Sequence, residues 1–272
     1  MTKAKNLLIT GASSGFGKAI AEQFVADGYR VVGTSRSAPS ETNIAAEGLT
    51  MVGLDVCSEQ SVDAFYALLQ SQNFLPDIVV LNAGSGIGGA IEDTSTAEVV
   101  KQFEINFFGV HRLVRLLSPD MRARGSGHII FIGSIGGRIT IPFQAFYSAS
   151  KAALSSYAFA LRMELQPFNI NVSLIEPGDH KTNFSETRKV QTSEARSAFG
   201  PAAARALEVM TSGERNGASA ESLAVLVKHA AEAKDPKMVY IKGNATEWMF
   251  IFLHKILPNR VFQHLLMKTY KI

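Results

Sequence analysis

Seven short apolar segments recur along the chain, and they constrain its fold more than any other feature. They are apolar on successive residues, which is typical of strands buried on both faces of a parallel sheet. Between them, apolar residues recur at helical spacing, as Phe16, Ile20 and Phe24 do. The pattern predicts an α/β fold of the doubly wound Rossmann type, with a seven-stranded parallel sheet flanked by helices. The expected strands are 6–10, 30–35, 49–56, 77–84, 128–134, 171–178 and 238–243.

Composition and charge exclude several classes of protein. The 272 residues, 46% of them hydrophobic, fit a single domain over 1–272. Twenty-seven basic and 24 acidic residues nearly balance, which does not indicate a nucleic-acid partner. The one cysteine cannot form an intrachain disulfide, and no apolar run has the length of a secretory signal or a membrane span. We therefore expect a cytoplasmic protein.

The sequence TGASSGFG (10–17) lies between the first expected strand and the first expected helix. Gly11 permits a tight turn, Gly15 lets the backbone approach a pyrophosphate, and Gly17 lets the helix pack against the sheet. The helix N-terminus offers free N–H groups and partial positive charge to that pyrophosphate. This context predicts a dinucleotide-binding loop; the alternative is a purely structural turn.

The end of the second strand indicates which dinucleotide binds. An acidic residue there would bind the ribose 2′-hydroxyl of NAD, but the chain reads GTSRS (33–37) and presents Arg36. A guanidinium suits a 2′-phosphate, and the hydroxyls of Ser13 and Ser35 could add hydrogen bonds. The cofactor is therefore predicted to be NADP(H). The alternative is that Arg36 is a solvated surface arginine.

Taken together, these motifs resemble the short-chain dehydrogenase/reductase family over residues 5 to about 185, and more loosely beyond. A departure is Leu81, where many members have an additional asparagine. The resemblance implies an oxidoreductase that interconverts a ketone or aldehyde and an alcohol by hydride transfer, without a metal. The histidines show no ligand spacing either. The matching residues are Thr10, Gly11, Gly15, Gly17, Asp55, Asn82, Ala83, Gly84, Asn106, Ser134, Tyr147, Lys151, Pro177, Gly178 and Thr182.

Tyr147 and Lys151 lie one helical turn apart, on the same face of an expected helix. A free phenol has a pKa near 10, and a nearby ammonium is expected to lower it toward neutral pH. Tyr147 is therefore the expected acid and base. Ser134, at the carboxyl end of the fifth strand, is expected to hydrogen-bond the substrate oxygen. By resemblance, Asn106 holds a water that links Lys151 to solvent, although a structural hydrogen-bonding role is equally compatible with its position.

The resemblance also implies contacts with the cofactor. Lys151 would hold the nicotinamide ribose, Asp55 the adenine amino group, and Thr182 the carboxamide, while Asn82 steadies the loop under the adenosine. His180 lies near this site in the sequence and could contact the substrate, but we expect it to be a solvated loop residue. The other expected cofactor-binding residues are Ser14, Phe16, Val56, Ala83, Gly84, Tyr147, Pro177 and Gly178.

The sequence of residues 133–151 resembles most closely that of the family members that act on hydroxysteroids and retinoids. Phe143 and Phe184 would supply apolar walls beside Ser134 and Tyr147, which suits a lipophilic ketone or alcohol. A different class of function stays open, because a sensing or scaffold protein can keep this fold without chemistry. Such a protein would not need the combination of serine, tyrosine and lysine.

Two segments lie outside the main pattern. Residues 179–218 are weakly patterned and partly helical, and they are expected to form a mobile lid over the substrate; the alternative is a fixed wall. Residues 246–272 form an expected helical tail that Pro258 divides in two. The tail would pack over the pocket or against another subunit of a dimer or tetramer. Alternatively, it would lie on a membrane surface.

Overall fold

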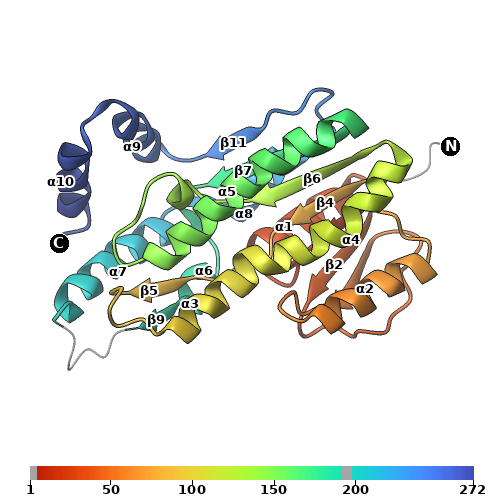
Figure 1. Ribbon diagram of the computed structural model, residues 1–272, viewed down its shortest axis with the longest axis horizontal. Helices are drawn as coiled ribbons and strands as arrows, with labels where there is room; N and C mark the ends of the chain where they lie inside the picture. The colour runs from red at the N-terminus through yellow and green to blue at the C-terminus, as the bar shows by residue number, and fades with distance from the viewer. Residues whose placement is uncertain (1–4, 192–197) are drawn as a thin grey trace.

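The computed structural model describes residues 5–191 and 198–272, and its centre is a seven-stranded parallel sheet (Figure 1). The strand order is β11-β7-β6-β4-β1-β2-β3, and every adjacent pair is parallel. All seven predicted strands are present, so the predicted doubly wound sheet is confirmed. The strands are β1 (Asn6–Ile9), β2 (Arg30–Ser35), β3 (Leu49–Gly53), β4 (Ile78–Leu81), β6 (Gly127–Ile132), β7 (Ile170–Pro177) and β11 (Val239–Lys242).

Helices cover both faces of the sheet because successive strand residues point to opposite sides. Leu8 of β1 belongs to the core formed with α2 (Glu59–Ser71), α4 (Gly109–Arg124) and α5 (Ala145–Leu165). Its neighbours Leu7 and Ile9 belong to the core formed with α1 (Gly15–Ala26) and α8 (Ala220–Glu232). These two layers explain why the strands read as continuous apolar runs. A further helix, α3 (Thr96–Phe103), precedes α4.

The strand order reverses direction at β1, which lies between β4 and β2. Connections leave β1 and β4 toward opposite faces of the sheet, so a crevice opens outside their carboxyl ends. The glycine loop follows β1, and residues 82–85 follow β4, so both predicted binding segments meet at this crevice.

The described part of 179–218 is more regular than its sequence indicates. It contains the 16-residue helix α7 (Gly200–Arg215), the short helix α6 (Phe184–Thr187) and three short strands. The strands β8 (His180–Lys181) and β10 (Ala218–Ser219) pair with each other, and β9 (Lys189–Gln191) pairs with β5 (Ile87–Gly89). Residues 192–197 of the predicted lid lie outside the described residues.

The C-terminal tail forms two helices, as predicted, α9 (Ala245–Ile256) and α10 (Asn259–Thr269). Pro258 precedes α10 and separates it from α9. Tyr270 and Ile272 pack against an apolar cluster on α7, so the tail folds back over the lid segment. Within residues 5–191 and 198–272, no helix is long and apolar enough to cross a membrane.

Candidate active site

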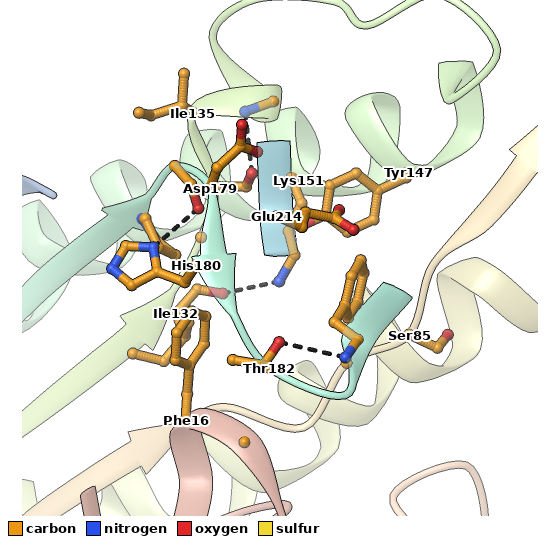
Figure 2. Close-up of a pocket in the computed structure, with 18 of the residues that line it drawn as sticks. Phe16, Ser85, Ile132, Ile135, Tyr147, Lys151, Asp179, His180, Thr182 and Glu214 are labelled. Carbon is orange, nitrogen blue, oxygen red and sulfur yellow. Dashed lines mark hydrogen bonds between the residues drawn. The ribbon is translucent and has the colours of Figure 1, made fainter. Parts of the chain in front are cut away.

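A cavity of about 630 Å³ opens at the carboxyl ends of the strands (Figure 2). Its walls come from the loops after β1, β2, β3, β4, β6 and β7, and from α5, α6, α7, α9 and α10. It therefore brings together segments that lie far apart in the sequence. The predicted site residues that line it are Gly11, Ser13, Ser14, Gly15, Phe16, Ser35, Arg36, Asp55, Val56, Asn82, Ala83, Gly84, Ser134, Tyr147, Lys151, Pro177, Gly178, Thr182 and Phe184.

Three predicted residues do not line the cavity: Gly17, Asn106 and Phe143. Gly17 lies beneath the glycine loop, where a β-carbon would overlap the carbonyl oxygen of Gly11. Phe143 packs beside the α7 cluster, with its ring 6.5 Å from that of Phe199. Gly17 thus shapes the loop from below, as its predicted packing role requires, and Phe143 supports the outer wall.

The glycine loop has the backbone that its sequence predicts. Gly11 and Gly15 have φ angles of +69° and +52°, in the left-handed region that favours glycine. Asn82 holds the loop from the next strand, because its Nδ2 donates to the carbonyl oxygens of Thr10 and Gly11 at 2.8 and 3.2 Å. The Thr10 hydroxyl accepts from the backbone N–H groups of Asn82 and Ala83, both at 2.9 Å. The two loops are therefore one rigid unit.

Arg36 and Asp55 line the cavity from the loops that follow β2 and β3. Arg36 is exposed in the turn after β2, and no other described residue forms a hydrogen bond or ion pair with its side chain. Asp55 is tied to its own turn, because its Oδ1 accepts from the N–H of Cys57 at 3.0 Å. The cavity wall thus includes a fixed carboxylate and a guanidinium that the described residues leave unpaired.

Tyr147 lies in the first turn of α5 and faces the cavity, with its ring 5.6 Å from that of Phe184 (Figure 2). Burial raises the pKa of this phenol, and the hydrogen bond with Ser134 lowers it by less. We expected the Lys151 ammonium to lower this pKa. That expectation is wrong for the protein alone, because the loss of solvent outweighs the neighbouring groups.

Lys151 is buried one turn further along α5 and points toward the sheet. Its Nζ donates to the carbonyl oxygen of Ile132, at the end of β6, at 2.8 Å. Burial lowers the pKa of this ammonium to about 8. The Nζ lies 5.9 Å from the centre of the Tyr147 ring, so the two side chains share one pocket. Lys151 is therefore held at a fixed place and can exchange a proton near neutral pH.

Asn106 lies behind the cavity in a π-helical turn, η1 (Glu104–Phe108), between α3 and α4. It is 1% exposed. Its Oδ1 accepts from the N–H of Ser85 at 2.9 Å, and its Nδ2 donates to the Ser85 carbonyl oxygen and the Ser150 hydroxyl. The side chain therefore joins the loop after β4 to α5. Of the two roles left open by the sequence, this geometry favours the structural one.

Sequence reasoning missed an acidic group in the cavity wall. Burial is the largest cause that raises the pKa of Asp179 from 3.8 to about 7, and the charges of Glu247 and Glu214 act in the same direction. These carboxylates come from three separate segments, so no local motif joins them. The only available signal was the position of Asp179 directly after Pro177 and Gly178, where a strand ends at the site.

The part of 179–218 that contains α6 and β9 is anchored to α7 by a buried ion pair. Arg188 of the α6–β9 segment donates to Glu214 at the end of α7, and Glu214 also accepts from the Ser185 hydroxyl. The guanidinium lies 5.7 Å from the ring of Phe184, the residue that packs on Tyr147. This arrangement fixes Phe184 in its place against Tyr147.

His180 is not the solvated loop residue that the sequence predicted. It is buried, and its ring lies edge-on at 5.1 Å from that of Phe16 in the glycine loop. Its Nδ1 lies 3.0 Å from the Gly178 carbonyl oxygen, and burial lowers the pKa of the imidazole. His180 thus lines the cavity and connects the segment after β7 to the glycine loop.

The chain matches the family model of short chain dehydrogenases over residues 5–193. It is 38% identical over 267 residues to a 3-ketodihydrosphingosine reductase of Bacteroides thetaiotaomicron, covering 98% of each chain. It is 39% identical over 201 residues to the retinol dehydrogenase 8 of Homo sapiens, covering 70% of this chain and 64% of that protein.

Solved structures share the fold over almost the whole chain. A short-chain dehydrogenase from Streptomyces avermitilis has a TM-score of 0.81 at 31% identity, covering 100% of this chain and 98% of that one. A serine dehydrogenase complexed with NADP+ has a TM-score of 0.75 at 25% identity, over 89% and 95% of the chains. A Burkholderia phymatum structure in complex with NAD has a TM-score of 0.78 at 25% identity, over 94% and 95%. Relatives therefore bind either dinucleotide.

Proposed function

The chain belongs to the short-chain dehydrogenase family, and we propose that it is an NADP(H)-dependent oxidoreductase that interconverts a lipophilic ketone and its alcohol. The family makes the chain an oxidoreductase; the choice of NADP(H), the lipophilic substrate and the role of Tyr147 are our proposal. The observation that carries it is the one cavity that joins the glycine loop to Ser134, Tyr147 and Lys151.

The residues of this cavity fit a nicotinamide dinucleotide. A side chain at Gly17 would collide with the loop backbone, and Gly11 and Gly15 adopt the turn that opens the α1 N-terminus toward the cavity. Asp55 and the loop that begins at Asn82 continue the wall from there. When bound, the dinucleotide supplies or accepts the hydride.

The preference for NADP(H) rests on Arg36. Its guanidinium is exposed at the cavity rim and free to bind a 2′-phosphate, and Ser13 and Ser35 lie on the same wall. The short sequence after β2 contains no carboxylate that would compete for a ribose hydroxyl. Solved structures of relatives contain either NADP+ or NAD, so the proposed preference depends on Arg36.

The proton steps follow from three side chains. Ser134 and Tyr147 hydrogen-bond the carbonyl oxygen of the substrate and orient it. During reduction the Tyr147 hydroxyl gives its proton to that oxygen, and its raised pKa keeps the phenol protonated at neutral pH until then. The Lys151 ammonium stabilises the phenolate left behind and returns a proton to it, which a pKa of about 8 permits. In alcohol oxidation the same steps run in reverse.

Apolar side chains dominate the outer part of the cavity and suit a lipophilic substrate. They come from the four helices α6, α7, α9 and α10 and from the loop after β6: Ile139, Ile141, Phe184, Val209, Met210, Phe250 and Leu266. The Bacteroides relative is named a reductase of 3-ketodihydrosphingosine. We therefore propose a long-chain ketone as the substrate class, with reduction as the favoured direction.

We further propose that the protein is a cytoplasmic homo-oligomer. Phe108, Phe159 and Met163 expose large apolar surfaces on η1 and α5, away from the cavity. Surfaces of this kind are commonly covered by another subunit. Light scattering on the purified protein measures the mass, and a mass equal to one chain at micromolar concentration would contradict this part of the proposal.

The proposed function is tested by titration and turnover. Affinities for NADPH and NADH are measured by cofactor fluorescence for the wild type and for Arg36→Ala, and oxidation of each cofactor is followed with long-chain ketones. A charge-assisted phosphate contact contributes about 1.5–3 kcal/mol, so we expect NADPH to bind roughly ten to a hundredfold more tightly only in the wild type. Equal affinities in the wild type would exclude the cofactor preference. Absence of turnover with every ketone would exclude the substrate class.

A further inference from the structure

Helix α9 carries an exposed apolar face that the fold does not use. Trp248, Met249, Phe252 and Ile256 are 48, 48, 61 and 58% exposed. Their spacing places them within about 100° of the helix circumference, because each residue advances the helix by about 100°. Helix α10 adds Val261 and Met267, which are also exposed. We call these six side chains the tail face.

The other sides of the two helices are occupied. Phe250 and Ile251 of α9 pack with Phe262 and Leu266 of α10, and the same cluster reaches Ile135 beside the cavity. Phe250 and Leu266 also line the cavity. The inner side of the tail is therefore a wall of the site, whereas in the described part of the chain no residue covers the tail face. Figure 1 shows both helices at one end of the molecule, beyond β11.

The charged residues around the tail face indicate which kind of surface binds there. Between Trp248 and Ile272 the chain has four basic residues, Lys255, Arg260, Lys268 and Lys271, and no acidic one. A second copy that docked through the same face would bring these like charges together, which disfavours a symmetric dimer here. An apolar face bordered by lysine and arginine complements a surface that is apolar inside and negative outside.

We propose that α9 and α10 dock the protein on an anionic phospholipid surface through the tail face. The helices have 12 and 11 residues, too few to span a bilayer, so they lie in the interface. Their inner side lines the cavity, so the bound protein holds its pocket against the membrane in which a lipophilic ketone accumulates. This last step rests on the proposed function; the docking itself does not.

The chain contains one tryptophan, Trp248, and it lies on the tail face. Its fluorescence therefore reports docking directly. Vesicles of phosphatidylcholine with about one third phosphatidylglycerol should shift its emission to shorter wavelength and sediment with the protein. Each basic residue contributes about fivefold to such binding, so Lys255→Glu combined with Arg260→Glu should weaken it at least twentyfold. Pure phosphatidylcholine and high salt should weaken binding of the wild type.

Matched control variants distinguish docking through the tail face from nonspecific adsorption to vesicles. Phe252→Glu should abolish sedimentation, whereas Val225→Glu, at an equally exposed apolar position on α8, should leave it unchanged. Lys234→Glu, outside the tail, is the control for charge. Circular dichroism and turnover of a water-soluble ketone show that each variant is folded. If the proposed function is wrong but the docking is right, the wild-type protein will not turn over the ketone and will still bind vesicles.

Three results would overturn the proposal. The first is absence of vesicle binding by the wild type at low salt. The second is equal binding by the Lys255→Glu, Arg260→Glu double variant. The third is a Trp248 emission shift that depends on protein concentration and not on vesicles, because a second copy would then cover the tail face.

Discussion

Replacing Asp179 with asparagine tests whether the ionised carboxylate of this residue lowers the stability of the folded protein. The side chain is partly buried after β7, next to Gly213, and its pKa rises from 3.8 to about 7. The folded protein therefore holds a proton on Asp179 between about pH 4 and 7, where the unfolded chain has lost it. Stability from this group is greatest at low pH and declines as the pH rises toward 7. Asparagine cannot ionise, so Asp179→Asn removes this dependence.

The magnitude follows from the two pKa values. Each tenfold difference in proton affinity corresponds to about 1.4 kcal/mol, so a pKa of about 7 in place of 3.8 gives at most about 4 kcal/mol. Solvent reaches part of the side chain, and we therefore expect about 2–4 kcal/mol. At pH 8 the variant should be more stable than the wild type by this amount. At pH 4 the two proteins should be nearly equal.

Urea unfolding at half-unit steps from pH 4 to 8 measures the difference. Asp63→Asn on the exposed face of α2 is the control for exchanging a carboxylate for an amide at a solvent-exposed position. A difference between Asp179→Asn and the wild type that stays constant across this range would show that the carboxylate is solvated. The argument from burial and from the charges of Glu214 and Glu247 would then be wrong.

Tyr147→Phe should reduce kcat by about 10²–10⁴-fold while cofactor affinity stays within threefold, and near-normal kcat would exclude the phenol as the acid. Lys151→Met should lower both kcat and cofactor affinity; a change in only one of these would exclude its double role. Gly17→Ala should cost about 1–3 kcal/mol of stability by thermal unfolding, because the new methyl group overlaps the loop; an unchanged Tm would contradict this packing. For the lid, we expect hydrogen exchange in 183–191 and 198–215 to slow when NADPH binds. Equal protection with and without NADPH would identify a fixed wall.

The sheet could be predicted from the sequence because a strand that is buried on both faces is apolar at successive residues. A strand such as Ile78–Leu81 has only apolar residues, whereas an amphipathic helix has polar residues between its apolar ones. The glycine loop was equally predictable, since Gly11 and Gly15 are required by positive φ angles. Motif spacing likewise placed Tyr147 and Lys151 together in the cavity.

The parts that were missed depend on distant contacts. The pKa of Tyr147 follows from how completely neighbouring segments exclude water, and the spacing to Lys151 contains no information about that. His180 was expected in solvent because its segment is weakly patterned, but Phe16 covers it. The environment of Asp179 could not be predicted either, since Glu214 and Glu247 approach it only after α7 and α9 fold over the site.

The π-helical turn at Glu104–Phe108 has a consequence for how this region can change in length. From Thr96 to Arg124 the chain runs without interruption through α3, this turn and α4. A π turn holds one more residue than an α turn, so deleting a single residue here would restore a regular helix. The turn itself absorbs the extra residue, so α3 and α4 would keep nearly the same orientation, but the residues of the turn would shift and Asn106 would leave the loop that it supports. The regular helices on either side contain no extra residue, so a deletion there would rotate everything beyond it by about 100°.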